Sequence, residues 1–133
     1  MTIEYGLQVT TKLSYTKAIE KVTAALKAEG FGVLTEIDVK ATLKKKLNAE
    51  FRRYIILGAC NPNLAYQALQ NELEIGLLLP CNVIVYEADD GQTTVSIVDP
   101  MIILGVVDSA PLKAVADKAY ARLSRVRDSL ATA

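Results

Sequence analysis

The sequence has 133 residues, of which 15 are basic and 15 acidic, so the formal net charge is zero. A chain of this length is typical of one domain, and we treat residues 1–133 as a single domain. Zero net charge provides no field that attracts nucleic acid or anionic lipid, so we expect neither a nucleic-acid partner nor a membrane partner.

Histidine is absent, and the chain has two cysteines. Histidine is the usual general base near neutral pH and a common zinc ligand, so His-dependent hydrolase triads and His-ligated zinc centres cannot be built from this chain alone. Two cysteines are also too few for a four-cysteine zinc site. We therefore assign no metal ligands, and the cofactor and the enzyme class stay open.

Apolar residues make up 51% of the sequence, which is high for a small domain with much surface for its volume. We therefore predict a homodimer. The N-terminus does not resemble a secretory signal, so we expect a cytoplasmic protein. The longest apolar stretches have seven residues, against about 20 for a membrane-spanning helix.

The first elements follow from periodicity. Apolar and polar residues alternate over residues 3–10, which predicts a strand with one buried face. Ser14 can cap a helix over residues 15–29, whose apolar positions share one stripe, and Gly30 is suited to end it.

A second strand is predicted over residues 31–37, followed by a short helix that Asp38 caps and whose outer face carries lysines. Residues 53–59 predict a third strand. Its centre is apolar on both sides, which indicates a position inside the sheet.

Asn61-Pro62 predicts a helix start, and that helix is expected to end near Gly76. Asp90-Gly91 joins residues 77–86 to residues 93–98 as a β-hairpin. The apolar run after Asp99-Pro100 fits a short helix or a strand, whereas the last helix, behind Ser109, shows clear helical spacing.

The predicted order is β-α-β-α-β-α-β-β-α. This order indicates an α+β domain with two layers, in which helices cover one mainly antiparallel or mixed sheet of about five strands. Such an architecture implies no activity, so the function depends on a site.

The two cysteines are each followed by asparagine, as Cys60-Asn61 and Cys81-Asn82. Cys60 precedes a predicted helix N-terminus, where the helix dipole can lower the pKa of a thiol. A buried structural role is the alternative for both cysteines, because free cysteine is often buried. Asn61 likewise fits a simple helix cap.

We predict a ligand-binding pocket near the two Cys-Asn motifs. It comprises Cys60, Asn61, Cys81 and Asn82, and the preceding strand adds Arg53 and Tyr54 to its wall. Three functions remain open. The first is a small-molecule or soft-ion binding module, since two thiolates can hold a Cu(I)-type ion. The second is a redox enzyme with an attacking and a resolving cysteine, and the third is a structural or interaction protein.

Whether the two cysteines meet depends on the path between them. A helix followed by a parallel strand would place them at opposite ends of the sheet. A helix that ends near Gln70 would let residues 71–79 return the chain toward Cys60. We also expect that Gly58 is small because a helix or a ligand lies over its strand.

Gly58-Ala59-Cys60-Asn61-Pro62 and the segment from Gly76 to Val83 resemble a bacterial and archaeal family known as domain of unknown function 302. The resemblance extends over about residues 1–126. It implies a compact α+β domain that is often dimeric, and it assigns neither an activity nor catalytic residues.

Overall fold

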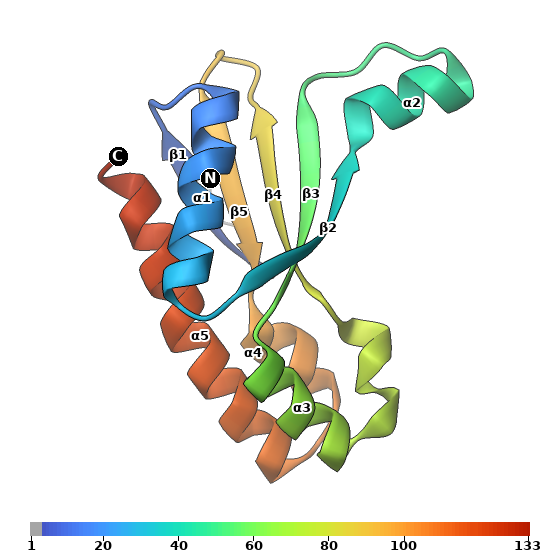
Figure 1. Cartoon of the computed structure of the whole chain (residues 1–133), viewed down its shortest axis with the longest axis vertical. Helices are drawn as coiled ribbons and strands as arrows, with labels where there is room; N and C mark the ends of the chain where they lie inside the picture. The colour runs from blue at the N-terminus through green and yellow to red at the C-terminus, as the bar shows by residue number, and fades with distance from the viewer. Residues whose placement is uncertain (1–3) are drawn as a thin grey trace.

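The computed structural model describes residues 4–133, which form one five-stranded sheet with helices packed on it (Figure 1). Ile3, the first residue of the first predicted strand, lies outside the described residues. In chain order the elements are β1 (Gly6–Thr11), α1 (Tyr15–Ala28), β2 (Gly32–Asp38), α2 (Val39–Leu47), β3 (Tyr54–Cys60), α3 (Pro62–Asn71), the 3₁₀ helix η1 (Leu73–Leu78), β4 (Cys81–Glu87), β5 (Thr93–Val98), α4 (Pro100–Ile103), the 3₁₀ helix η2 (Leu104–Val106) and α5 (Ala110–Ala131).

The strand order in the sheet is β1-β5-β4-β3-β2, and every neighbouring pair is antiparallel. This confirms the predicted α+β class and the predicted order of elements. β3 lies between β4 and β2, as the apolar centre of that segment indicates.

Helices α1 and α5 pack against one face of the sheet (Figure 1). The inward-facing side chains at the centre of the strands are aliphatic and contact the apolar stripes of these helices. The burial of these side chains stabilises the fold. The fully buried centre of this core consists of Leu26, Leu57, Ile75, Ile97, Leu112, Leu123, Leu130, Val22, Val83, Val85, Val95 and Val126.

Four predicted helix starts are confirmed by side-chain caps. Ser14, Asp38, Asn61 and Ser109 each accept a hydrogen bond from the backbone N–H three residues further along. Such a cap satisfies one of the N–H groups that have no partner within the helix, so these short polar side chains fix where each helix begins.

Two segments differ from the expected boundaries. The helix after Asn61 ends at Asn71 instead of near Gly76, and residues 73–78 form η1, so that β4 begins only at Cys81. The apolar run after Asp99, which periodicity leaves undecided, is helical, because Asp99 caps Met101 and Pro100 stands in the first turn.

Helix α2 is unlike the others, because none of its residues is buried. It lies at the β2 side of the sheet and projects away from the helices that cover the core (Figure 1). Among the helices of residues 4–133, none is both long enough and apolar enough to span a membrane.

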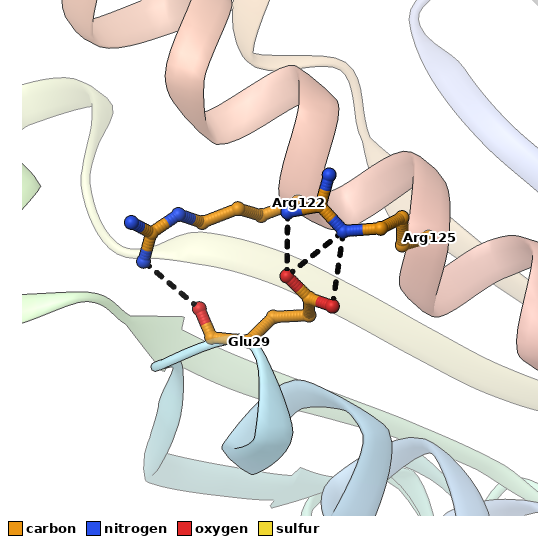
Figure 2. Close-up of polar contacts among 3 residues, drawn as sticks. All are labelled: Glu29, Arg122 and Arg125. Atoms are coloured by element: carbon orange, nitrogen blue, oxygen red, sulfur yellow. Dashed lines mark hydrogen bonds and ion pairs between the residues drawn. The ribbon is translucent and has the colours of Figure 1, made fainter.

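A polar contact joins the end of α1 to α5 (Figure 2). The Glu29 carboxylate accepts hydrogen bonds from Nε and Nη2 of Arg125, at 3.1 and 2.8 Å, and Arg122 Nη1 donates to the Glu29 backbone oxygen at 3.2 Å. The hydrogen bonds from Arg125 lower the pKa of the Glu29 carboxyl group.

Candidate functional site

The two cysteines lie at the same end of the sheet. β3 and β4 are antiparallel neighbours, and their register pairs Ala59 with Cys81, so Cys60 is one residue beyond the position opposite Cys81. The alternative in which a parallel crossover separates the two cysteines is therefore wrong. The early end of α3 and the return of the chain through η1 bring the start of β4 back to the end of β3.

Both cysteines line one small cavity of about 30 Å³. A cavity of this size has room for about one or two water-sized groups, whereas pockets for organic ligands measure roughly 300–1,000 Å³. Apart from Asn61, the side chains around it are apolar: Phe31, Ala59, Leu64, Ala65, Ala68, Leu79, Pro80, Leu104, Val115 and Ala119. The cavity therefore excludes all but very small ligands.

Asn61 is buried at the edge of this cavity and caps α3, since its Oδ1 accepts a hydrogen bond from the Leu64 backbone N–H at 3.1 Å. The cap role that the sequence suggests is confirmed. A side chain on Gly30 would come within 3.0 Å of Asn61 Nδ2 and 3.2 Å of Arg122 Nη1, and Gly30 also has a φ of +83°. The turn after α1 thus encloses the amide of Asn61, and glycine is required there.

The electrostatics of Cys60 differ from the expectation. Burial raises the pKa of the Cys60 thiol, whereas its place before a helix predicted a lower pKa. Two features of the helix start explain the difference: Pro62 has no N–H, and the Leu64 N–H is already bonded to Asn61. With few free donors to stabilise a thiolate, the cost of desolvation dominates.

Burial raises the pKa of the Cys81 thiol further, to about 11, and a negative charge on Cys60 adds to the rise. The charge state of Cys60 therefore affects the pKa of Cys81, which agrees with two thiols at the same end of the sheet. Both are free cysteines, and their raised pKa values favour the protonated thiols near neutral pH.

The remaining predicted residues do not share this cavity. Asn82 follows Cys81 and therefore points to the opposite face of the sheet, where it is exposed. Tyr54 and Arg53 lie at the other end of β3. There the Tyr54 ring stacks on Tyr86 with centroids 5.3 Å apart, and Arg53 lies near Glu87 at 3.8 Å. The predicted pocket of six residues thus divides, and only Cys60, Asn61 and Cys81 line the cavity.

Gly58 is small for a reason other than the expected one. A Cβ at this position would collide with Thr35 Oγ1 on the neighbouring strand β2 and come within 2.9 Å of Pro80 Cγ. Neither a helix nor a ligand is needed to explain this glycine. The side chains that crowd it come from the segments on either side of β3.

Helices supply a part of the cavity wall that was not predicted from the sequence. Ala65, Ala68 and Ala119 lie on α3 and α5 and allow these helices to approach the cysteines. Their signal in the sequence is alanine on the inner stripe of an amphipathic helix. That signal does not reveal which strand end the helix will cover.

Within residues 4–133, no group of three or more His, Cys, Asp or Glu side chains is placed to hold a metal ion. Any ion at the cysteines would therefore have to accept two sulfur ligands. Linear two-sulfur coordination is a property of soft ions such as Cu(I), and is not typical of zinc.

These features define a class of protein: a two-layer α+β domain with an antiparallel sheet and two partly buried cysteines that line one small cavity where β3 meets β4. The family model of domain of unknown function DUF302 matches residues 7–130, so the chain belongs to the DUF302 family.

A similar solved structure is the crystal structure of the uncharacterized conserved protein DUF302 from Bacillus stearothermophilus. Its sequence identity to this chain is 30%, the alignment covers 96% of this chain and 99% of that chain, and the TM-score is 0.88. No curated protein matches the chain. The resemblance that the sequence motifs indicate is therefore confirmed.

Proposed function

We propose that this protein binds a single soft monovalent metal ion, of the Cu(I) type, through the sulfur atoms of Cys60 and Cys81. The observation that supports this most is that the only two cysteines of the chain, 21 positions apart, line one small and mainly apolar cavity. An apolar wall disfavours hydrated hard ions, because they would lose water without gaining oxygen ligands.

The size of the cavity argues against an organic small molecule as the ligand at the two cysteines. About 30 Å³ accommodates an ion but no organic substrate of ordinary size. If the protein binds a small organic molecule, that molecule must use another surface.

The raised pKa values of both thiols argue against the second hypothesis, a redox enzyme with an attacking and a resolving cysteine. An attacking cysteine needs an accessible thiolate near neutral pH, and burial here favours the protonated form. Metal binding does not need a preformed thiolate, because a soft ion can displace the protons as it binds. The proposed binding therefore releases protons and strengthens as the pH rises.

The test is a titration of the reduced protein with Cu(I), in competition with a chromophoric Cu(I) chelator. We expect one equivalent per chain for the wild type, and at least a tenfold weaker affinity for Cys60→Ser and for Cys81→Ser. Met101→Leu is the control, because it removes a soft thioether sulfur outside the cavity lining and should leave the affinity unchanged.

Two results would contradict the proposal. One is a wild-type affinity no greater than that of the variant with both cysteines replaced. The other is rapid alkylation of both thiols at neutral pH together with weak Cu(I) binding, which would favour the redox enzyme. If the thiols are inert in both assays, the cysteines are ordinary core residues, as in the structural alternative.

We also propose that the chain acts as a homodimer in the cytoplasm. The apolar excess of the sequence supports the dimer, and two reduced cysteines agree with a reducing compartment. The long C-terminal helix α5 does not offer an apolar face for this interface. Its apolar stripe is buried within the protomer, at Leu112, Val115, Ala116, Ala119, Leu123, Val126 and Leu130.

A further inference from the structure

One face of the sheet is not covered by the helices that form the core. The register of the strands identifies the side chains on this open face, since cross-strand partners point to the same side. Apart from the pair Gly32 and Cys60 at the end of the sheet, which borders the cysteine cavity, they are Gly6, Gln8, Thr10, Thr35, Ile37, Tyr54, Ile56, Gly58, Asn82, Ile84, Tyr86, Thr94, Ser96 and Val98.

None of these 14 residues is charged, although 23% of the chain is. A solvated face of an antiparallel sheet normally alternates polar and charged side chains with the buried ones. At the average composition of the chain, about three charged residues would be expected at 14 positions. The open face is therefore unlike a surface that is adapted to water alone.

The centre of the open face is apolar and aromatic. Ile84, Ile56 and Ile37 are cross-strand neighbours in a row across β4, β3 and β2. Beside this row, the rings of Tyr54 and Tyr86 stack at 5.3 Å with an interplanar angle of 10°. Cross-strand pairs of this kind form a continuous apolar platform.

An exposed apolar margin continues the platform at one end. A hollow that contains Asn82 and Val98 is also lined by Leu77, Ile102 and Val106, which are 81%, 50% and 72% exposed. These side chains come from η1, α4 and η2. The open face and this margin, which we call the neutral surface, are therefore continuous.

We infer that the neutral surface is the interface with a second copy of this chain, packed face to face. The inference rests on the proposed homodimer and specifies the surface that forms it. In a two-fold interface the residues near the axis meet their own copies, so any charge there would face a like charge. A surface without charged sheet residues avoids this repulsion.

The shape of the neutral surface also suits a second copy. Tyr5 is 66% exposed and stands at the rim of a hollow of about 420 Å³ that is formed by open-face residues, among them Tyr54, Tyr86 and Ile84. A protruding side chain and a hollow on the same surface are self-complementary, because a two-fold axis lets each copy fill the hollow of the other.

The area is compatible with a dimer at the lower end of the stable range. Five strands spaced about 4.8 Å apart and about six residues long give a flat footprint of about 480 Å². Projecting side chains and the apolar margin enlarge it toward the roughly 600 Å² per partner that small stable interfaces bury. Two such sheets would pack about 10 Å apart.

The test is light scattering of the eluting protein, with the wild type and three variants at about 100 µM. We expect a wild-type mass of twice 14.4 kDa. Ile84→Arg places a like charge at the centre of the surface and should return the mass to 14.4 kDa. Asn82→Arg should also return the mass to 14.4 kDa. Asn82 is exposed, so this substitution does not disturb packing within one chain.

Tyr66→Arg is the matched control. Tyr66 is a large side chain, 65% exposed, on α3, which packs against α5 on the other side of the sheet. The control should remain dimeric, and circular dichroism should show that all variants are folded. The protein is used without metal, so the outcome does not depend on the cysteines.

Each result decides a separate point. A wild type that is monomeric at this concentration overturns the homodimer itself. A dimeric wild type with dimeric Ile84→Arg and Asn82→Arg variants overturns the neutral surface as its interface and retains the homodimer. If Ile84→Arg does not fold, Asn82→Arg alone decides between these outcomes.

Discussion

The two faces of the sheet use the same strands but very different side chains. At the centre of the covered face, the positions are aliphatic and completely buried, as at Val83, Val85, Val95 and Ile97. On the open face, alternate residues of the same strands are threonine, serine, amides, tyrosine and isoleucine, and most are half-buried or exposed. Helices of the same chain cover the first face, whereas the 14 positions of the open face carry no charged side chain.

This difference shows that burial is not the only reason to exclude charge from a strand. Thr94 and Ser96 are buried on the open face, on β5, which lies between β1 and β4 in the sheet. The composition of this face is intermediate between a core and a solvated surface. Such a composition is typical of protein interfaces, where charged residues are depleted and aromatic residues are enriched.

We expect the largest difference in stability between the two faces at a matched pair of isoleucines, Ile97 and Ile84. Ile97→Ala, on the covered face, should destabilise the protein by about 4 kcal/mol, because it leaves a cavity in a fully buried core. Ile84→Ala, on the open face of the adjacent strand, should cost about 1 kcal/mol in the monomer. Urea denaturation at low protein concentration measures both. Equal losses would mean that the two faces are equally buried within one chain.

The Cys81 thiol extends the covered face to the end of the sheet, and its pKa gives a pH test. The pKa is about 11 in the folded protein against 9.0 for an unperturbed thiol. Below pH 9 the thiol is protonated in both states and its contribution to stability is complete. Between pH 9 and 11 the unfolded chain loses the proton first, so up to about 2.7 kcal/mol of stability is lost as the pH rises.

Cys81→Ala is the reference for this measurement, because the tyrosines and lysines titrate equally in both proteins. The stability difference between wild type and variant should decrease from about pH 8 to about pH 11. A difference that does not change with pH would show that Cys81 is solvated, and would weaken the distinction between the covered end of the sheet and the open face.

A substitution at Gly58 measures how closely the side chains on the open face are packed around β3. Gly58→Ala should destabilise the protein by about 2 kcal/mol, because the new Cβ meets Thr35 Oγ1 and Pro80 Cγ. Thr35→Ala removes the first of these contacts and should restore part of the stability in the double variant, with Thr35→Ala alone as control. If the losses simply add, Thr35 is not the side chain that crowds this position.

The smallest effect is expected outside both faces, at the contact between α1 and α5 in Figure 2. Glu29→Gln keeps the size of the side chain but loses the charge that pairs with Arg125. The melting temperature at neutral pH should fall by on the order of 2 °C, since exposed ion pairs contribute little. The lowered pKa of Glu29 means that this contribution is present above the usual pKa of a carboxyl group and is lost as the pH falls. A fall in melting temperature as large as that of Ile97→Ala would show that the helix layer is held by charge more than by apolar burial.

The sequence by itself determined the elements of this fold. Side chains with local partners marked the helix starts at Ser14, Asp38, Asn61 and Ser109, and alternation marked the strands. These features depend on residues within one or two turns of each other, so they can be predicted from spacing alone. The family motif around Cys60 and Cys81 was recognisable in the same way.

The tertiary structure decided which elements are neighbours. That Ala59 pairs with Cys81 depends on how η1 returns the chain, and no local signal separates this path from a parallel crossover. The pKa of the Cys60 thiol is raised because the folded chain buries it, whereas its place before a helix in the sequence indicated a lowered pKa. The open face became visible only when the strands were paired, because its 14 uncharged residues come from five segments that are distant in sequence and adjacent only through long-range hydrogen bonds.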